Sequence, residues 1–265
     1  MKRLFLLCCC LAAAVPFSAR GESLERALRA VTDSVRATVG VAVVFGDGDT
    51  LAVNGGRCYP MLSVCKFHQA LAVLDRLDRR GLPLTTRIPV RRSDLLPGTW
   101  SPLREACPGG GRFTVAELLT YSVAQSDNNV CDVLFRFLGG TEAVDRYIAG
   151  LGIGETVIVA DEEMMHRHTD NQYLNRTTPL AAVRLLELFR RGELLSAAYG
   201  DFLLETMFAT ETGPDKLRGL LPADVAVAHK TGSSDRDGRG VKIADNDIGI
   251  VRLPDGRSYS IAVFA

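Results

Sequence analysis

Three short polar motifs carry side chains that could perform nucleophilic chemistry. Ser63 and Lys66 lie three residues apart in "SVCK", and "SDN" and "KTG" follow at residues 126–128 and 230–232. Positions i and i+3 share one face of a helix, so Ser63 and Lys66 can touch. A serine hydroxyl attacks a carbonyl carbon efficiently when a base takes its proton, and a lysine with a lowered pKa can be that base. The first motif therefore predicts a serine nucleophile beside a lysine.

The first motif has little weight by itself, because a pattern with two fixed positions occurs by chance in many proteins. Its partners add weight, since S-x-x-K, S-D-N and K-T-G together are the signature of class A β-lactamases and penicillin-binding proteins. The chain resembles the class A serine β-lactamases over nearly all of its length beyond the first residues. It is most similar to the cephalosporinase-leaning, extended-spectrum branch, through "SVCKFHQALAVL", "SDNNVCD", "TGPDKLRGLLPADVAVAHKTGSS" and "ADNDIGIVRLPDGR".

The resemblance implies a catalytic role for four residues of these motifs. Ser63 would attack the lactam carbonyl and become acylated. Ser126 would pass a proton to the departing lactam nitrogen, with Lys66 and Lys230 on either side to lower the cost of that transfer. The implied activity is hydrolysis of β-lactam antibiotics, both penicillins and cephalosporins, which confers antibiotic resistance.

The resemblance also implies which residues bind the substrate. The backbone N–H groups of Ser63 and Ser233 would form the oxyanion hole, and free N–H groups at a helix start suit a developing anion. Asn128 would hold the amide side chain of the lactam. Lys230, Thr231 and Ser233 would receive its carboxylate, because a cation and hydroxyl donors are the groups that bind one.

Release of the acyl group requires a carboxylate that activates water, and three adjacent acids compete for this role: Asp161, Glu162 and Glu163. The family pattern is a glutamate followed after two residues by Leu or Met, within an Ω-loop. Glu162 matches best, because Met165 follows it at that spacing. His166 stands where the family usually has an asparagine that binds the hydrolytic water, so we expect His166 at the substrate site.

Other interpretations fit the same motifs. A penicillin-binding DD-peptidase, or a related serine acyltransferase, shares every motif except the Ω-loop acid. An inactive, truncated homologue is the third hypothesis, because the sequence stops at Ala265, where the family has a further helix. Lys216 either supplies the extra positive charge that the family often obtains from arginine or is a solvated helix residue.

The composition favours an ordinary globular enzyme that acts on a small molecule. The 265 residues are 47% hydrophobic and 23% charged, which is typical of a globular chain. Lys+Arg and Asp+Glu both total 31, so no overall basic field points to nucleic acid as a partner. No H-E-x-x-H or comparable spacing indicates a metal, and no cofactor is expected. The expected partner is the β-lactam substrate, and the expected state is a monomer.

The first residues have the layout of a secretory signal peptide. A basic start, an apolar run and small residues follow one another over residues 1–21. The run is too short to span a membrane comfortably. We expect export to a bacterial periplasm with cleavage of this segment. A lipid anchor at Cys8, Cys9 or Cys10 is the alternative, but the preceding leucines form a poor lipoprotein cleavage box.

Cleavage would leave four cysteines: Cys58, Cys65, Cys107 and Cys131. An oxidising compartment permits disulfides, and buried free thiols are the other interpretation. The sequence does not choose among the three possible pairings. Cys65 lies about 200° around a helix from Ser63, so we expect it in the core.

Strand-like segments lie near both ends of the chain, and helical segments lie between them. The pattern predicts a hairpin over residues 39–54 and strands over residues 224–234, 246–253 and 257–264. Capping signals place helix starts at Thr114 and Thr178. A short helix is expected over residues 215–221.

These elements predict an α+β fold of the β-lactamase/transpeptidase type. An antiparallel sheet would be assembled from both ends of the chain and flanked by helices, with an all-helical domain inserted and the family's C-terminal helix missing. Residues 22–60 and 207–265 would form the α/β domain. Residues 61–206 would form the helical domain, with the Ω-loop at about 160–178.

Overall fold

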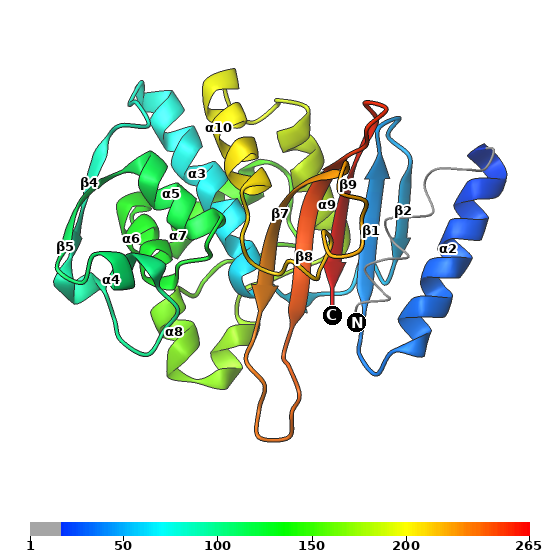
Figure 1. The fold of residues 1–265 in the computed structure, drawn as a ribbon, viewed down its shortest axis with the longest axis horizontal. Helices are drawn as coiled ribbons and strands as arrows, with labels where there is room; N and C mark the ends of the chain where they lie inside the picture. Colours follow the sequence, from blue (N-terminus) through cyan, green and yellow to red (C-terminus); the bar gives the residue numbers. More distant parts are fainter. Residues whose placement is uncertain (1–16) are drawn as a thin grey trace.

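The computed structural model describes residues 17–265, with side chains from Ser23 onward. Most of the predicted signal peptide, residues 1–16, therefore lies outside the described residues. In Figure 1 a sheet stands between helix α2 on one side and a large group of helices on the other. Within the described part of the chain, no helix is long and apolar enough to cross a membrane.

A five-stranded antiparallel sheet joins the two ends of the described chain. In sheet order its strands are β2 (Thr50–Val53), β1 (Gly40–Phe45), β9 (Ser258–Phe264), β8 (Asp245–Arg252) and β7 (Ala226–Ser233). β1 pairs with both β2 and β9, so Val43 lies opposite Leu51 on one side and Ile261 on the other. The predicted hairpin and the three later strands are confirmed.

Side chains alternate along these strands, which gives the sheet two apolar faces. On one face, Val41 and Val43 are buried in a cluster with Leu24 and Leu28 of α2 (Phe17–Ser34). The opposite face packs against α9 (Pro179–Arg190), which lies behind the sheet in Figure 1. Because both faces are covered, the strands are buried along most of their length.

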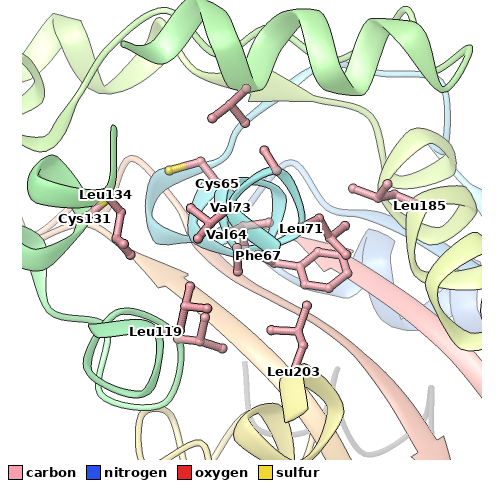
Figure 2. Close-up of a cluster of buried hydrophobic side chains, with 14 of the residues drawn as sticks. Val64, Cys65, Phe67, Leu71, Val73, Leu119, Cys131, Leu134, Leu185 and Leu203 are labelled. Atoms are coloured by element: carbon pink, nitrogen blue, oxygen red, sulfur yellow. The ribbon is translucent and has the colours of Figure 1, made fainter. Parts of the chain in front are cut away.

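A group of helices packs around α3 (Cys65–Arg80), the central helix of the second core. Figure 2 shows Phe67 and Leu71 of this helix among side chains of its neighbours, including Leu119 and Leu203. Cys65 is fully buried there, as predicted, and all four described cysteines are free thiols. The elements that precede or follow α3 in this group are η2 (Leu62–Val64), β4 (Arg87–Arg91), η3 (Arg92–Asp94), α4 (Pro102–Ala106), β5 (Gly110–Thr114), α5 (Val115–Val123), α6 (Asn128–Leu138) and α7 (Thr141–Gly150).

A short irregular region connects α7 to α9 and carries the predicted Ω-loop. It contains α8 (Glu162–Arg167), η4 (Thr169–Tyr173) and β6 (Arg176–Thr177), and β6 pairs with β3 (Tyr59–Pro60) just before η2. Thr178 then caps α9, with Pro179 at its first position, and α10 (Ala197–Phe208) follows. The pairing of β3 with β6 holds this region beside the start of α3.

The α+β fold class is confirmed, and both predicted helix caps are present: Thr114 with Glu117 and Thr178. The short helix expected over residues 215–221 is wrong, because this segment forms turns. One backbone N–H in it, that of Leu217, donates to Asp247 of β8 at 3.2 Å. The domain boundaries remain a prediction; α9, inside the predicted helical segment, packs on the sheet.

Candidate active site

Ser63 and Lys66 meet where η2 leads into α3. The Nζ atom of Lys66 donates to the Ser63 hydroxyl at 2.9 Å, as the i, i+3 spacing predicts. The lysine is fully buried and also donates to the Ser126 carbonyl at 2.9 Å and to the Asn128 side chain at 2.6 Å. Its ion pair with Glu162 measures 2.9 Å. Lys66 thus connects four of the residues singled out in the sequence.

The charge state of Lys66 follows from its surroundings. Burial is the largest effect and would lower its pKa, but the charge and hydrogen bond of Glu162, together with the nearby Cys131 and Cys65, raise the pKa above the usual lysine value. Lys66 therefore holds its proton in the resting site. It can accept the proton of Ser63 only after it has passed one on, and Glu162 is the adjacent acceptor.

Ser126 is held between two buried lysines in the loop before α6. Lys230 donates to its hydroxyl at 2.9 Å, and Lys66 approaches the same oxygen at 3.5 Å. The backbone of Ser126 has a φ of 59°, which is uncommon for a residue with a side chain. Asp127 fixes this loop, because its carboxylate caps α6 at Val130 and accepts the Ser101 hydroxyl at 2.9 Å.

The pKa of Lys230 is shifted in the opposite direction to that of Lys66. Lys230 is fully buried on β7 and has no ion pair among the described residues; it donates to Ser126 and to the Thr231 carbonyl. Burial is the largest effect and the charge of Lys66 adds to it, so the pKa of Lys230 falls to about 7. A proton can therefore leave or return to Lys230 near neutral pH.

The three adjacent acids of the Ω-loop have different positions. Glu162 is only 6% exposed and faces Lys66. Glu163 is exposed and pairs with Arg167, and Asp161 caps α8 by accepting the Met164 N–H at 2.8 Å. Glu162 is thus the acid that the fold directs at Lys66 and the cavity, which agrees with the sequence pattern.

Asp132 of α6, which the sequence did not single out, holds α8 in place. Its two carboxylate oxygens accept the backbone N–H groups of Glu162 at 2.7 Å and Glu163 at 3.0 Å. Burial and then the charge of Glu162 raise its pKa to about 7. Asp132 follows Asn128 by one helical turn, and this spacing was the only signal in the sequence.

A chain of hydrogen bonds runs across the mouth of the site through His166. Asn128 donates to the Thr99 hydroxyl at 2.7 Å, and Thr99 contacts His166 Nε2 at 3.1 Å. The other ring nitrogen of His166 lies 3.0 Å from the Glu162 carbonyl. The structure thus places His166 beside Glu162, as expected, and adds Thr99 to the set.

The other end of the site is formed by β7 and its neighbours. Thr231 shares a hydrogen bond of 2.6 Å with Thr212, and Ser233 accepts from Lys216 at 2.7 Å. Lys216 is 7% exposed and forms an ion pair of 2.9 Å with Asp245. Lys216 is therefore not a solvated helix residue, and its role as the extra positive charge of the site stays a prediction.

These residues surround a cavity of about 430 Å³, a volume typical of a small-molecule site. Ser63, Asn128, Glu162, His166 and Ser233 all line it, together with Trp100, which is 57% exposed at the rim. Among residues 17–265 no group of His, Cys, Asp or Glu is arranged to hold a metal ion. The arrangement supplies a nucleophile, proton carriers and a carboxylate beside one cavity, which is the equipment for acyl transfer.

Comparison with known proteins agrees with this chemistry. The β-lactamase enzyme family matches residues 23–265. A β-lactamase of Bacteroides uniformis is 45% identical, over 91% of this chain and 82% of that protein. The extended-spectrum β-lactamase PER-1 of Pseudomonas aeruginosa is 41% identical, over 93% and 80%. The crystal structure of the TLA-3 extended-spectrum β-lactamase superposes with a TM-score of 0.90 at 46% identity, covering 92% of this chain and 90% of that one.

The fold and the serine–lysine site define a serine-dependent acyl-transfer enzyme. With these relatives, the chain belongs to the class A serine β-lactamases, and it hydrolyses β-lactams.

Proposed function

We propose that Ser63 is the residue acylated by the lactam. The observation that carries this proposal is the cluster of Ser63, Lys66 and Glu162, joined by two contacts of 2.9 Å at the wall of the cavity. Lys66 first passes a proton to Glu162 and then takes the proton of Ser63 as its oxygen attacks. Ser126, between Lys66 and Lys230, returns a proton to the lactam nitrogen.

The backbone at the end of β7 supports the proposed oxyanion hole. An added Cβ at Gly232 would lie 3.2 Å from the Ser63 nitrogen, so the end of β7 runs directly beside the nucleophile. The N–H groups of Ser63 and Ser233 would stabilise the charge that develops on the carbonyl oxygen. Thr231, Ser233 and Lys230 would bind the substrate carboxylate, and Asn128 its amide.

Once Lys66 has given its proton through Ser126 to the lactam nitrogen, Glu162 returns its own proton to Lys66. The Glu162 carboxylate is then proposed to release the product by activating water against the acylated Ser63. Its burial and its contact with Lys66 place it beside the nucleophile. His166 would lie close to this water, because its ring is held by Thr99 and the Glu162 backbone. This acid separates the β-lactamase mechanism from that of a DD-peptidase.

The proposed substrates are penicillins and cephalosporins, with a preference for cephalosporins. The extended-spectrum names of PER-1 and TLA-3 support this choice. We also propose that residues 1–21 are removed during export to the periplasm and that the mature enzyme is monomeric. N-terminal sequencing of the exported protein and its mass in solution test these two statements.

Replacement of Ser63 and Glu162 tests the mechanism. Ser63→Ala should lower nitrocefin hydrolysis on the order of 10³-fold or more, because no acyl-enzyme can form. Glu162→Gln should leave acylation measurable but release slow, so intact-mass spectrometry should show a long-lived adduct. Glu163→Gln is the matched control, since its side chain is exposed and pairs with Arg167 rather than with Lys66. Normal turnover by Glu162→Gln would exclude the deacylation role, and a stable adduct on the unmodified enzyme would favour a DD-peptidase.

A further inference from the structure

We propose that Asp245 sets the affinity of this enzyme for the carboxylate of its substrates, by competing for the groups that bind it. Asp245 begins β8, opposite Ser233 at the end of β7. The proposal rests on the function proposed above, in which Ser233 receives the substrate carboxylate. It assigns a specificity role to a residue outside the three motifs.

Asp245 already accepts the hydrogen bonds of the donor groups at this end of the site. Its Oδ1 atom accepts the Ser233 hydroxyl at 3.0 Å and contacts the Lys216 ammonium group at 2.9 Å. Lys242 lies 3.3 Å from the same oxygen. The Ser233 hydroxyl has one proton, so while it donates to Asp245 it cannot donate to a substrate.

The hydrogens of the Lys216 ammonium group are also already bound to neighbouring acceptors. Besides Asp245 it donates to the Ser233 hydroxyl at 2.7 Å and to the Asn246 carbonyl at 2.9 Å, and the Gly232 carbonyl lies 3.3 Å away. An ammonium group has three hydrogens, and these neighbours account for all of them. A substrate carboxylate that reaches Ser233 must therefore displace a contact with Asp245.

The charge of Asp245 opposes the same ligand. Burial alone would raise its pKa, but Lys216 and Lys242 outweigh burial and hold the pKa below the usual aspartate value. Asp245 is therefore ionised at neutral pH and only 6% exposed. A second carboxylate on Ser233 would lie within a few ångströms of this negative charge, and like charges so close repel each other.

Binding measured without turnover tests the proposal. In a Ser63→Ala background, Asp245→Asn should tighten binding of a penicillin free acid by about 3- to 10-fold, the range of one screened charge interaction. Binding of the methyl ester of the same penicillin should not change, because the ester carries no charge. Calorimetry gives both dissociation constants, and the ratio of ester to acid is the quantity compared.

Two further variants keep the result decisive. Asp255→Asn is the matched control, because Asp255 pairs with Arg257 in the exposed turn between β8 and β9. If Asp245→Asn melts early, Asp245→Ser removes the charge without placing an amide N–H beside Lys216. Unchanged or weaker binding of the acid would overturn the proposal, and would mean that Asp245 only orients Ser233. Failure of the proposed function would appear instead as unaltered turnover by Ser63→Ala.

Discussion

Two buried lysines lie near one serine hydroxyl in this site, and their pKa values are shifted in opposite directions. Lys66 is paired with Glu162 and keeps its proton, whereas Lys230 has no paired carboxylate among the described residues and its pKa falls to about 7. Both side chains are fully buried, so burial does not separate them; Lys66 has the Glu162 carboxylate as its partner, whereas the charge of Lys66 lowers the pKa of Lys230 further. A site of this kind can hold a proton on one side of Ser126 and exchange it on the other.

The pKa of Lys230 predicts a pH dependence for carboxylate-bearing substrates. Below about pH 7 Lys230 is charged and attracts the carboxylate, and above this pH the free enzyme loses that charge. We expect kcat/KM, which reports the free enzyme, to decline as pH rises through this range. Arginine at position 230 keeps its charge throughout this pH range. We expect Lys230→Arg to have a lower kcat/KM than the unmodified enzyme, but without the decline as pH rises. A Lys230→Arg profile with the same alkaline decline as the unmodified enzyme would contradict the assignment.

The motif residues could be predicted because each motif is local in the sequence. Ser63 and Lys66 are one helical turn apart, and the pattern after Glu162 selected it from three acids. Asp132 and Asp245 could not be found in this way. Their partners lie 30 and 12 residues away, so only the folded chain brings them together.

At the scale of elements, the position of Glu162 depends on how α8 is anchored to α6. Asp132 accepts two backbone N–H groups at the start of α8, where the helix dipole also favours a negative charge. The anchor is nevertheless costly, because the carboxylate is buried near Glu162 and its pKa is raised to about 7. The enzyme thus fixes its Ω-loop with a group that resists ionisation.

Asp132→Asn should alter both stability and turnover. Between about pH 4 and pH 7 the folded state binds more protons at Asp132 than the unfolded state, so this residue lowers stability progressively as pH rises. The variant should therefore be more stable relative to the unmodified enzyme at pH 8 than at pH 5, as thermal melts would show. Asparagine offers one acceptor for two N–H groups, so release of the acyl group should also slow. An identical difference in melting temperature at both pH values would refute the raised pKa.

The helix starts that the sequence predicted correctly have local signals, whereas the helix predicted over residues 215–221 is wrong despite such signals. Thr114 with Glu117 and Thr178 with Pro179 mark helix starts by themselves. Residues 215–221 have helical composition but bond elsewhere: the Leu217 N–H donates to Asp247, and Lys216 reaches across to Asp245. Contacts with the sheet outweighed local propensity there.

In the whole molecule, the sheet and the helical group meet at a very close backbone contact. Gly232 of β7 lies against η2, just before α3, where an added Cβ would stand 2.5 Å from the Met61 carbonyl oxygen and 3.0 Å from the Val64 nitrogen. No side chain fits this space. The contact aligns Ser63 with the end of β7.

Gly232→Ala should therefore separate the two halves of the site. We expect a loss of about 1–3 kcal/mol in the free energy of unfolding, typical of overpacking. The fall in kcat/KM should be larger than this loss explains, since the Ser63 and Ser233 N–H groups would no longer converge. Denaturant unfolding and nitrocefin kinetics measure the two effects. Gly238→Ala, in open space in the loop between β7 and β8, is the control and should change neither.

The order of strands in the sheet also has a kinetic consequence. β1 lies between β2 and β9, and Val41 pairs with Val263, more than two hundred residues later in the chain. Closing so long a loop costs chain entropy before the strand contact can stabilise the chain, which makes such pairings slow to form. During synthesis β1 has no second neighbour until residues 258–264 have been made. Until then one edge of β1 is open, which leaves the unpaired backbone groups of an apolar strand available to other chains.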